Sequence, residues 1–345
     1  MTKKIVTLAG DGIGPEIMVA GLEVLAAVAS KEGFCYEIDE RVFGGAAIDA
    51  VGTPLPKDTL EAAKSSDAIL LAAIGSPRYD TAPIRPEQGL LAIRKELKLF
   101  ANIRPVQIFK ALRHLSPLKE DFIRDVDFVV VRELTGGIYF GEHHLKRDSA
   151  QDINAYTTFE IERILRKAFE LARSRKKRVT SIDKQNVLAT SKLWRKVANQ
   201  VAKDYPEVTL EHQLVDSAAM MMITNPSRFD VIVTENLFGD ILSDESSVLS
   251  GTLGVMPSAS HSVDGPSLYE PIHGSAPDIA GQNLANPISM ILSVAMMLRE
   301  SFAEKTAALM IEKAVEKTLS EGTLTADLGG NATTSEMTQA IVSNL

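Results

Sequence analysis

Short apolar runs alternate with longer amphipathic segments along most of the chain. Apolar runs rich in β-branched residues are typical of buried strands, and they occur at residues 5–9, 36–43, 68–74, 127–133, 179–182, 208–215 and 231–235. Apolar positions with helical spacing predict helices at residues 16–29, 56–65, 87–99, 158–173, 191–205 and 239–249, and mostly helix from about residue 286 onward. This alternation predicts an α/β fold around a largely parallel, buried sheet.

Two breaker-rich segments flank a middle block of the chain. They are Asn102-Ile-Arg-Pro105 and Gly251-Thr-Leu-Gly254, and we interpret both as connections because proline and glycine interrupt regular structure. The chain of 345 residues is long enough for two domain-sized units. A middle domain inserted between the two halves of an outer domain would account for both segments.

Charge and composition narrow the classes of partner. The net charge is −8 and the pI about 5.4, whereas a protein that binds the phosphate backbone of nucleic acid needs a basic face. The basic cluster Arg173-Ser-Arg-Lys-Lys-Arg178 follows a predicted helix, and we interpret it as a solvated helix end. The N-terminal residues contain no apolar signal-peptide core, and the apolar stretch at 288–298 is too short to span a bilayer. We therefore predict a cytoplasmic protein that binds neither nucleic acid nor membrane.

A pair of aspartates is the first candidate for chemistry. Asp240 and Asp244 are four residues apart in a helical segment, so they share one helix face and repel each other. No basic residue within the segment offsets them, so either solvent screens both or a cation lies between them. Because Cys35 is the only cysteine, a metal site must use oxygen or imidazole ligands, and carboxylates suit Mg²⁺ or Mn²⁺. Asp216 is a third ligand only if the fold brings it near.

A glycine-rich turn follows the first predicted strand. Gly10-Asp-Gly-Ile-Gly14 is similar to the Rossmann dinucleotide motif, but that motif requires a glycine where this chain has Pro15. Proline suits the first turn of a helix, where its missing N–H is not needed. We therefore predict a tight strand-to-helix turn near a binding cleft and not a Rossmann fold.

Several basic side chains lie where an anion could be bound. Arg94 and Arg104 adjoin apolar segments, and Arg132 and Lys184 end predicted strands, at the edge where open α/β sheets bind ligands. Each arginine either forms a local salt bridge or holds a carboxylate. Lys184 near other cations could act as a base. Tyr139 lies in a glycine-rich stretch and is either a proton donor or an anchoring aromatic residue.

The segment His273-Gly-Ser-Ala-Pro-Asp-Ile279 is a loop that precedes a helical region. Its backbone N–H groups could hold phosphate oxygens. Asp278 could accept hydrogen bonds from a ribose diol.

Taken together, these segments closely resemble the isocitrate/isopropylmalate dehydrogenase family of decarboxylating β-hydroxyacid dehydrogenases. The resemblance covers nearly the whole chain. It rests on Gly10–Glu16, Glu87-Gln-Gly-Leu-Leu-Ala-Ile-Arg94, Phe100-Ala-Asn-Ile-Arg-Pro105, Val131-Arg-Glu-Leu-Thr-Gly-Gly-Ile-Tyr-Phe-Gly141, Asp183-Lys-Gln-Asn-Val-Leu188, Thr234-Glu-Asn-Leu-Phe-Gly-Asp-Ile-Leu-Ser-Asp-Glu245 and Glu270-Pro-Ile-His-Gly-Ser-Ala-Pro-Asp-Ile-Ala-Gly281.

The resemblance implies a fold and an assembly. The fold is α/β and not Rossmann, with two domains that share a central mixed sheet. Residues 1–99 and 252–345 form the first, cofactor-binding domain. Residues 100–251 form the second domain, which makes a homodimer and carries an arm near residues 135–157.

The resemblance also implies roles for individual residues. Arg94, Arg104 and Arg132 hold the carboxylates of the substrate, and Asp240 and Asp244 bind Mg²⁺ or Mn²⁺ together with Asp216 of the partner subunit, which also contacts the substrate. Lys184, likewise donated across the dimer, is the base, and Tyr139 is the proton donor. The cofactor-binding positions are Glu270, His273, Gly274, Ser275, Ala276, Pro277, Asp278, Ile279 and Asn286.

Two local features indicate the branch of the family. Glu87, Leu90 and Leu91, with Val187 from the other subunit, match a pocket for an isopropyl group, and leucines there would leave a third carboxylate unpaired. Asp278-Ile279 matches the users of NAD, because a carboxylate would repel the 2′-phosphate of NADP.

The implied reaction is the NAD-dependent oxidation and decarboxylation of (2R,3S)-3-isopropylmalate to 4-methyl-2-oxopentanoate and CO₂, a step of leucine biosynthesis. The alternatives within the family are dehydrogenases acting on D-malate, tartrate or homoisocitrate. A remote alternative is a non-catalytic binding protein on the same fold.

Overall fold

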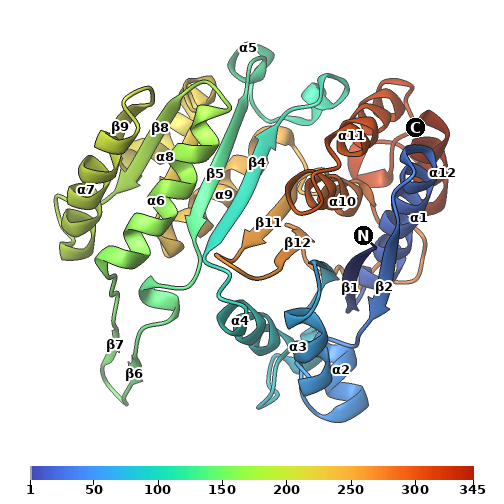
Figure 1. The fold of residues 1–345 in the computed structure, drawn as a ribbon, viewed down its shortest axis with the longest axis horizontal. Coiled ribbons are helices and arrows are strands. Elements are labelled where there is room, and N and C mark those ends of the chain that lie inside the picture. Colours follow the sequence, from blue (N-terminus) through green and yellow to red (C-terminus); the bar gives the residue numbers. More distant parts are fainter. Residues whose placement is uncertain (1) are drawn as a thin grey trace. The chain divides into compact units, whose positions relative to one another are not determined.

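The computed structural model describes residues 2–345, which divide into two compact units (Figure 1). The first unit consists of the chain up to Leu99, Phe109–Leu115 and Thr252–Leu345. The second consists of Phe100–Ile108 and Ser116–Gly251. The short segment Phe109–Leu115 therefore belongs to the first unit although the chain on both sides of it belongs to the second.

The sheet of the first unit has the strand order β2-β1-β3-β12-β11. The strands are β1 (Lys3–Gly10), β2 (Tyr36–Glu40), β3 (Ala68–Ala73), β11 (Pro257–His261) and β12 (Ser267–Pro271). Neighbouring strands are parallel except β11 and β12, so the sheet is mixed. The helices of this unit are α1 (Gly14–Glu32), α2 (Gly44–Val51), α3 (Lys57–Lys64), α4 (Pro86–Glu96), α10 (Ile288–Glu300), α11 (Lys305–Ser320) and α12 (Thr334–Asn344), with short helical turns η1 (Pro77–Tyr79), η2 (Lys110–Leu115) and η7 (Ala326–Leu328).

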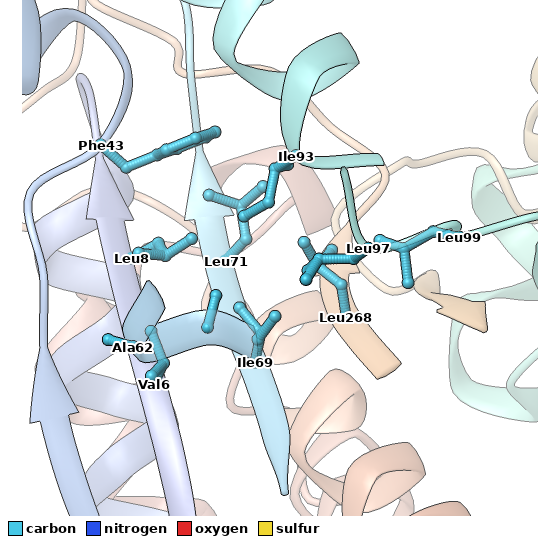
Figure 2. Close-up of a cluster of buried hydrophobic side chains, with 11 residues drawn as sticks. Val6, Leu8, Phe43, Ala62, Ile69, Leu71, Ile93, Leu97, Leu99 and Leu268 are labelled. Carbon is cyan, nitrogen blue, oxygen red and sulfur yellow. The ribbon is translucent and has the colours of Figure 1, made fainter. Parts of the chain in front are cut away.

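A buried apolar cluster fixes helix α4 to this sheet. Val6, Leu8, Ile69 and Leu71 of the strands are fully or almost fully buried, and Ile93 of α4 packs against them (Figure 2). The helix thereby buries one stripe against the sheet and leaves another stripe free for function. The apolar stretch at 288–298 belongs to α10, a core helix, and every residue of the stretch is buried. No helix in residues 2–345 is long and apolar enough to cross a membrane.

The sheet of the second unit has the strand order β4-β5-β10-β8-β9. The strands are β4 (Ala101–Gln107), β5 (Asp127–Glu133), β8 (Arg178–Asp183), β9 (Thr209–Leu214) and β10 (Val231–Thr234). β4 is antiparallel to β5, and the other neighbours are parallel. The helices are α5 (Glu120–Ile123), α6 (Thr158–Arg173), α7 (Ala189–Val201), α8 (Val215–Thr224) and α9 (Asn236–Ser247), with turns η3 (Gly137–Tyr139), η4 (Ala202–Asp204), η5 (Pro226–Arg228) and η6 (Val248–Ser250). An exposed hairpin of β6 (His143–Leu145) and β7 (Ala150–Asp152) protrudes from this unit (Figure 1).

The predicted strands and helices are all present, with their ends moved by a few residues. The interpretation of Asn102–Pro105 as a connection is wrong, because these residues lie inside β4. Pro105 is tolerated there because it pairs antiparallel with Val129, and such a ladder leaves alternate N–H groups outside the pairing. The sequence pattern also missed α2, α8, β11 and β12, whose glycine-, methionine- or serine-rich segments lack clear periodicity.

Candidate active site

One edge of the second sheet gathers polar side chains. The parallel strands β5, β10 and β8 end at this edge, and the register pairs Thr234 of β10 with both Arg132 and Ile182. Antiparallel β4 begins at the same edge, because Asn102 pairs with Arg132. The carboxyl ends of parallel strands are where open α/β sheets bind ligands. Arg132, Lys184 and the start of α9 therefore lie along the expected edge.

Helix α9 presents two aspartates, and each contacts an arginine from a neighbouring strand. Nη1 of Arg132 donates to Asp240, and Nη1 of Arg104 donates to Asp244 over 3.1 Å. Arg104 also donates to the hydroxyl of Ser243 over 2.6 Å. Both arginine side chains are largely buried, whereas Asp244 is mostly exposed. The repulsion within α9 is thus offset by guanidinium groups of β4 and β5, which the sequence of the helix alone could not reveal.

Tyr139 reaches the same acidic face. Its hydroxyl donates a hydrogen bond to Asp240, and its ring lies 5.4 Å from the guanidinium carbon of Arg132. Burial and, after it, the neighbouring Asp240 carboxylate raise the pKa of the Tyr139 hydroxyl. The phenol therefore keeps its proton at neutral pH and is placed as a donor.

Lys184 and Asp216 form a separate pair in the same unit. Lys184 follows β8, and its Nζ lies 2.7 Å from the carboxylate of Asp216 in the first turn of α8. This contact holds the pKa of the Asp216 carboxyl below its usual value. Within residues 2–345 neither side chain hydrogen-bonds Asp240 or Asp244. Val187, three residues beyond the lysine, is exposed.

The donor set of α9 fits a hard divalent cation. Asp240 and Asp244 lie one turn apart and offer only carboxylate oxygens, which Mg²⁺ and Mn²⁺ prefer. Among residues 2–345, no group of three or more histidine, cysteine, aspartate or glutamate side chains is placed to hold a metal ion. A complete coordination shell on this pair therefore needs oxygen atoms from outside it, from substrate, water or another chain.

Helix α4 of the first unit carries the remaining predicted substrate residues on one stripe. Glu87, Leu90, Leu91 and Arg94 have the spacing of a single helix face. Glu87 and Leu91 are exposed, Leu90 is half-buried, and Arg94 donates to Glu270 of β12 over 3.1 Å. The Nε–H of Arg94 is buried without a hydrogen-bond partner, as is that of Arg104. A buried unpaired donor on a cation favours an anionic ligand.

The loop after β12 packs against the glycine-rich turn. The backbone N–H of Ile13 donates to the carbonyl of Ser275 over 2.8 Å, and the Ser275 hydroxyl donates to the carbonyl of Gly75 over 2.6 Å. Gly12 has φ +59°, and a Cβ there would lie 2.0 Å from the Ser275 carbonyl oxygen. Only glycine allows this approach, which explains the turn without a Rossmann motif. Pro15 lies in the first turn of α1, as predicted.

The other predicted cofactor residues lie on or beside this loop. Burial lowers the pKa of His273, so the imidazole is neutral, and its Nε2 is buried without a partner. Ala276 has φ +38°, a strained value for a residue other than glycine. Asn286 donates to Asp327 over 3.0 Å. The predicted cofactor-binding positions are Glu270, His273, Gly274, Ser275, Ala276, Pro277, Asp278, Ile279 and Asn286, of which Gly274, Pro277 and Asp278 are exposed.

Three residues that support these groups were not predicted. Asp11 accepts hydrogen bonds from the backbone N–H groups of Gly45, Ala46 and Gly75, at 2.8 to 2.9 Å. Asn236 accepts from Arg132, and Asp327 accepts from Asn286. The sequence signal is their position: Asn236 comes directly after a predicted strand and Asp11 two residues after one, where buried backbone and side-chain donors need acceptors.

Comparison with known proteins identifies the family. A model of the isocitrate/isopropylmalate dehydrogenase family matches residues 4–341. The chain is 76% identical over 345 residues to a 3-isopropylmalate dehydrogenase of Streptococcus thermophilus, covering 100% of both chains. It is 66% identical to a 3-isopropylmalate dehydrogenase of Lactococcus lactis, covering 100% of this chain and 99% of that one.

A solved structure shows the same architecture. The crystal structure of isocitrate dehydrogenase from Methylococcus capsulatus superposes with a TM-score of 0.89 at 37% identity and covers 99% of both chains. The sequence match and the structural match both extend over essentially the full length. The chain belongs to the isocitrate/isopropylmalate dehydrogenase family.

Proposed function

We propose that this protein is a cytoplasmic, NAD-dependent 3-isopropylmalate dehydrogenase of leucine biosynthesis. It would oxidise and decarboxylate (2R,3S)-3-isopropylmalate to 4-methyl-2-oxopentanoate and CO₂. The names of relatives that are 60–76% identical over essentially the full length support the activity. The observation in this chain that supports the choice of substrate is the stripe of α4 on which Leu90 and Leu91 lie beside Arg94.

That stripe suits a carboxylate next to a branched apolar group. Leu91 is 40% exposed, so it offers apolar area that a ligand can cover. Arg94 is largely buried and keeps an unpaired Nε–H. A substrate with a third carboxylate in place of the isopropyl group would bury that charge against leucine without a partner.

The three arginines would hold the substrate carboxylates. Arg104 and Arg132 contact the two aspartates of α9, so a substrate bound to them meets the proposed metal ligands at once. Guanidinium groups suit this role because they donate to a carboxylate in a planar, bidentate manner and stay charged. Arg94 contributes from α4 of the first unit.

Asp240 and Asp244, with the partner subunit's Asp216, would hold Mg²⁺ or Mn²⁺. When bound, the metal ion supplies Lewis-acid polarisation of substrate oxygens, and NAD supplies the hydride acceptor. The loop from His273 to Ile279 and Asn286 would hold NAD. The exposed carboxylate of Asp278 favours a ribose diol over a 2′-phosphate.

Lys184 and Tyr139 would move the protons. Lys184 would accept the proton of the C2 hydroxyl, and NAD⁺, held by the loop from His273 to Ile279, would supply the acceptor for the hydride of C2. The carboxylate on C3 then leaves as CO₂, and its bonding electrons remain on the C2–C3 unit as an enolate. Tyr139, whose hydroxyl stays protonated because of its surroundings, delivers a proton to C3.

A homodimer would complete each site. Exposed apolar side chains lie on α8 and α9, where Met220, Ile241 and Val248 are 69%, 56% and 49% exposed, the last just beyond α9. Leu145 of the protruding hairpin is 89% exposed. Apolar groups of this size on adjacent elements favour an interface with a second copy of the chain.

A substrate panel tests the proposal. NADH formation is measured with 3-isopropylmalate, D-malate, tartrate, homoisocitrate and isocitrate, each with Mn²⁺ and with excess EDTA. We expect the highest kcat/KM for 3-isopropylmalate and loss of activity in EDTA. A higher kcat/KM for another acid would overturn the assignment of substrate, and full turnover in EDTA would overturn the metal site.

A further inference from the structure

Asn236 occupies the point at which the groups of the proposed site meet. It is the first residue of α9 and is only 1% exposed. It follows β10, which is paired in parallel with β5, and Arg132 lies opposite Thr234 in that register. The backbone N–H of Asn236 donates to the Tyr156 hydroxyl over 2.9 Å. The main chain of Asn236 is therefore held in place independently of the contacts that its side chain makes.

The side chain of Asn236 contacts two other segments. Its Oδ1 accepts from Nε and Nη2 of Arg132, over 3.0 and 2.7 Å. Its Nδ2 donates to the carbonyl of Gly136 over 3.2 Å. The orientation of the amide is unambiguous, because arginine can only donate and a carbonyl can only accept.

The contact with Arg132 leaves the guanidinium suited to anions. Asn236 binds the Nε–Nη2 edge, so the Nη1 side remains directed to Asp240. A neutral amide holds that edge without cancelling the positive charge, whereas a carboxylate there would compete with the substrate. The stem of Arg132 lies against α9, since a Cβ at Gly239 would approach its Cγ to 2.6 Å. Gly239 and Asn236 thus hold the stem and one edge of the same side chain.

The contact with Gly136 reaches the tyrosine that donates a proton. Gly136 directly precedes η3, which ends at Tyr139. Gly137 has φ +74°, and a Cβ there would lie 2.4 Å from the Tyr156 hydroxyl. Tyr156 consequently packs beneath the turn as well as holding Asn236. One amide side chain links the turn of Tyr139 to Arg132.

We propose that Asn236 is a positioning residue that fixes the guanidinium edge of Arg132 and the turn bearing Tyr139 in one arrangement. The inference rests on the proposed function, in which Arg132 binds substrate and Tyr139 donates a proton. Asn236 touches neither reactant, and it acts through those two residues.

Two substitutions test the role. Asn236→Ala removes both contacts, and we expect KM for 3-isopropylmalate to rise about tenfold, as for a lost hydrogen bond to a charged group, with a fall in kcat. Asn236→Asp keeps an acceptor for Arg132 but adds a charge and loses the donor to Gly136, so KM rises here too. KM for NAD is expected to stay within about twofold in both.

Double variants show through which residue Asn236 acts. In an Arg132→Lys background, which lacks the Nε–H, Asn236→Ala is expected to add no further rise in KM. In a Tyr139→Phe background it is expected to add no further fall in kcat. Ser181→Ala is the control, because it removes a buried hydrogen bond of the same unit, from Trp194, and should lower Tm without changing KM.

The outcomes separate the inference from the proposed function. A wild-type KM in Arg132→Lys means that Arg132 does not bind the substrate, and the proposed site is wrong. A raised KM in Arg132→Lys together with wild-type KM in both Asn236 variants overturns the positioning role alone. If Asn236→Ala does not fold, the isosteric Asn236→Asp carries the test.

Discussion

At the scale of single residues, the charges on the acidic face of α9 are offset by side chains that are far away in sequence. Asp240 and Asp244 are separated from Arg132 and Arg104 by more than a hundred positions. Spacing along the helix predicted the pair of aspartates correctly, but it could not show which cations face them. Tertiary pairing of this kind depends on strand order, and no local pattern encodes strand order.

Lys184→Met tests the proposed base. The substitution keeps the length and apolar stem of the side chain but removes the amine that lies 2.7 Å from Asp216. We expect kcat to fall about 10²-fold or more, as for loss of a general base, with a smaller change in KM for the substrate. Steady-state kinetics measure both. Lys192→Met, on the exposed surface of α7, is the matched control, and turnover near that of the wild type in Lys184→Met would rule out the role.

Glu235→Gln tests whether the buried carboxylate of Glu235 at the start of α9 destabilises the folded protein. Glu235 is buried and accepts from the N–H of Phe238, and burial raises the pKa of its carboxyl above the usual value. The folded protein therefore binds this proton more tightly than the unfolded chain, so stability falls as pH rises from the usual value through the raised one. Glutamine keeps the acceptor and has no charge to bury.

We expect Glu235→Gln to melt higher than the wild type at pH 8, by about 2 °C or more, and the gain to shrink toward pH 5. Thermal unfolding followed by circular dichroism across this range measures it. An equal difference in Tm at both pH values would mean that ionisation of Glu235 does not carry the effect.

At the scale of elements, strands and helices could be predicted wherever apolar periodicity was strong. α6 begins and ends at the predicted residues, and its Thr157–Glu160 capping box explains the sharp start. β4 was missed because Pro105 and polar residues interrupt its pattern, yet its partner β5 supplies the pairing. The arginine of β4 could be named from the sequence, but its place beside α9 depends on that pairing.

We predict that the loop after β12 determines the choice of cofactor and that this choice can be changed without moving the backbone. Asp278 is exposed, and the bonds that shape the loop there use main-chain atoms, such as Ile279 N–H to Ala276 O at 3.2 Å. We expect Asp278→Lys with Ile279→Tyr to move the ratio of kcat/KM for NADP⁺ over NAD⁺ upward by at least about tenfold, because a repulsive charge becomes attractive.

Kinetics with both cofactors measure this ratio. Asp278→Asn is the control, since it removes the repulsion without adding a cation and should shift the ratio less. An unchanged ratio in the double variant would place the ribose elsewhere than at Asp278.

At the scale of the whole molecule, the sequence resemblance indicated the family and its fold, and the comparisons confirm both. The proposed assembly could not be predicted from the periodicity of one sequence, because a site shared between subunits depends on a second copy of the chain. In the described chain Asp216 contacts Lys184, and Asp240 contacts Arg132 and Tyr139. In the proposed homodimer, Lys184 and Asp216 of one chain would lie beside Asp240 of the other chain.

Mixing two inactive variants tests whether the site is shared. Lys184→Met removes a group that each chain would contribute to the site of its partner. Asp240→Asn alters a group that each chain would contribute to its own site. In a mixed dimer one site carries both defects and the other carries none. Random reassociation of equal amounts makes about half of the dimers mixed, so we expect about a quarter of wild-type activity to return.

The control mixture combines Asp240→Asn with Asp244→Asn. Both residues belong to the same chain's contribution, so every site in the mixed dimer keeps one defect and no activity should return. Recovery in the first mixture but not in this one requires that Lys184 and Asp240 act in one site from different chains. If neither mixture recovers although tagged subunits are shown to exchange, each site is built within a single chain and the shared-site proposal is wrong.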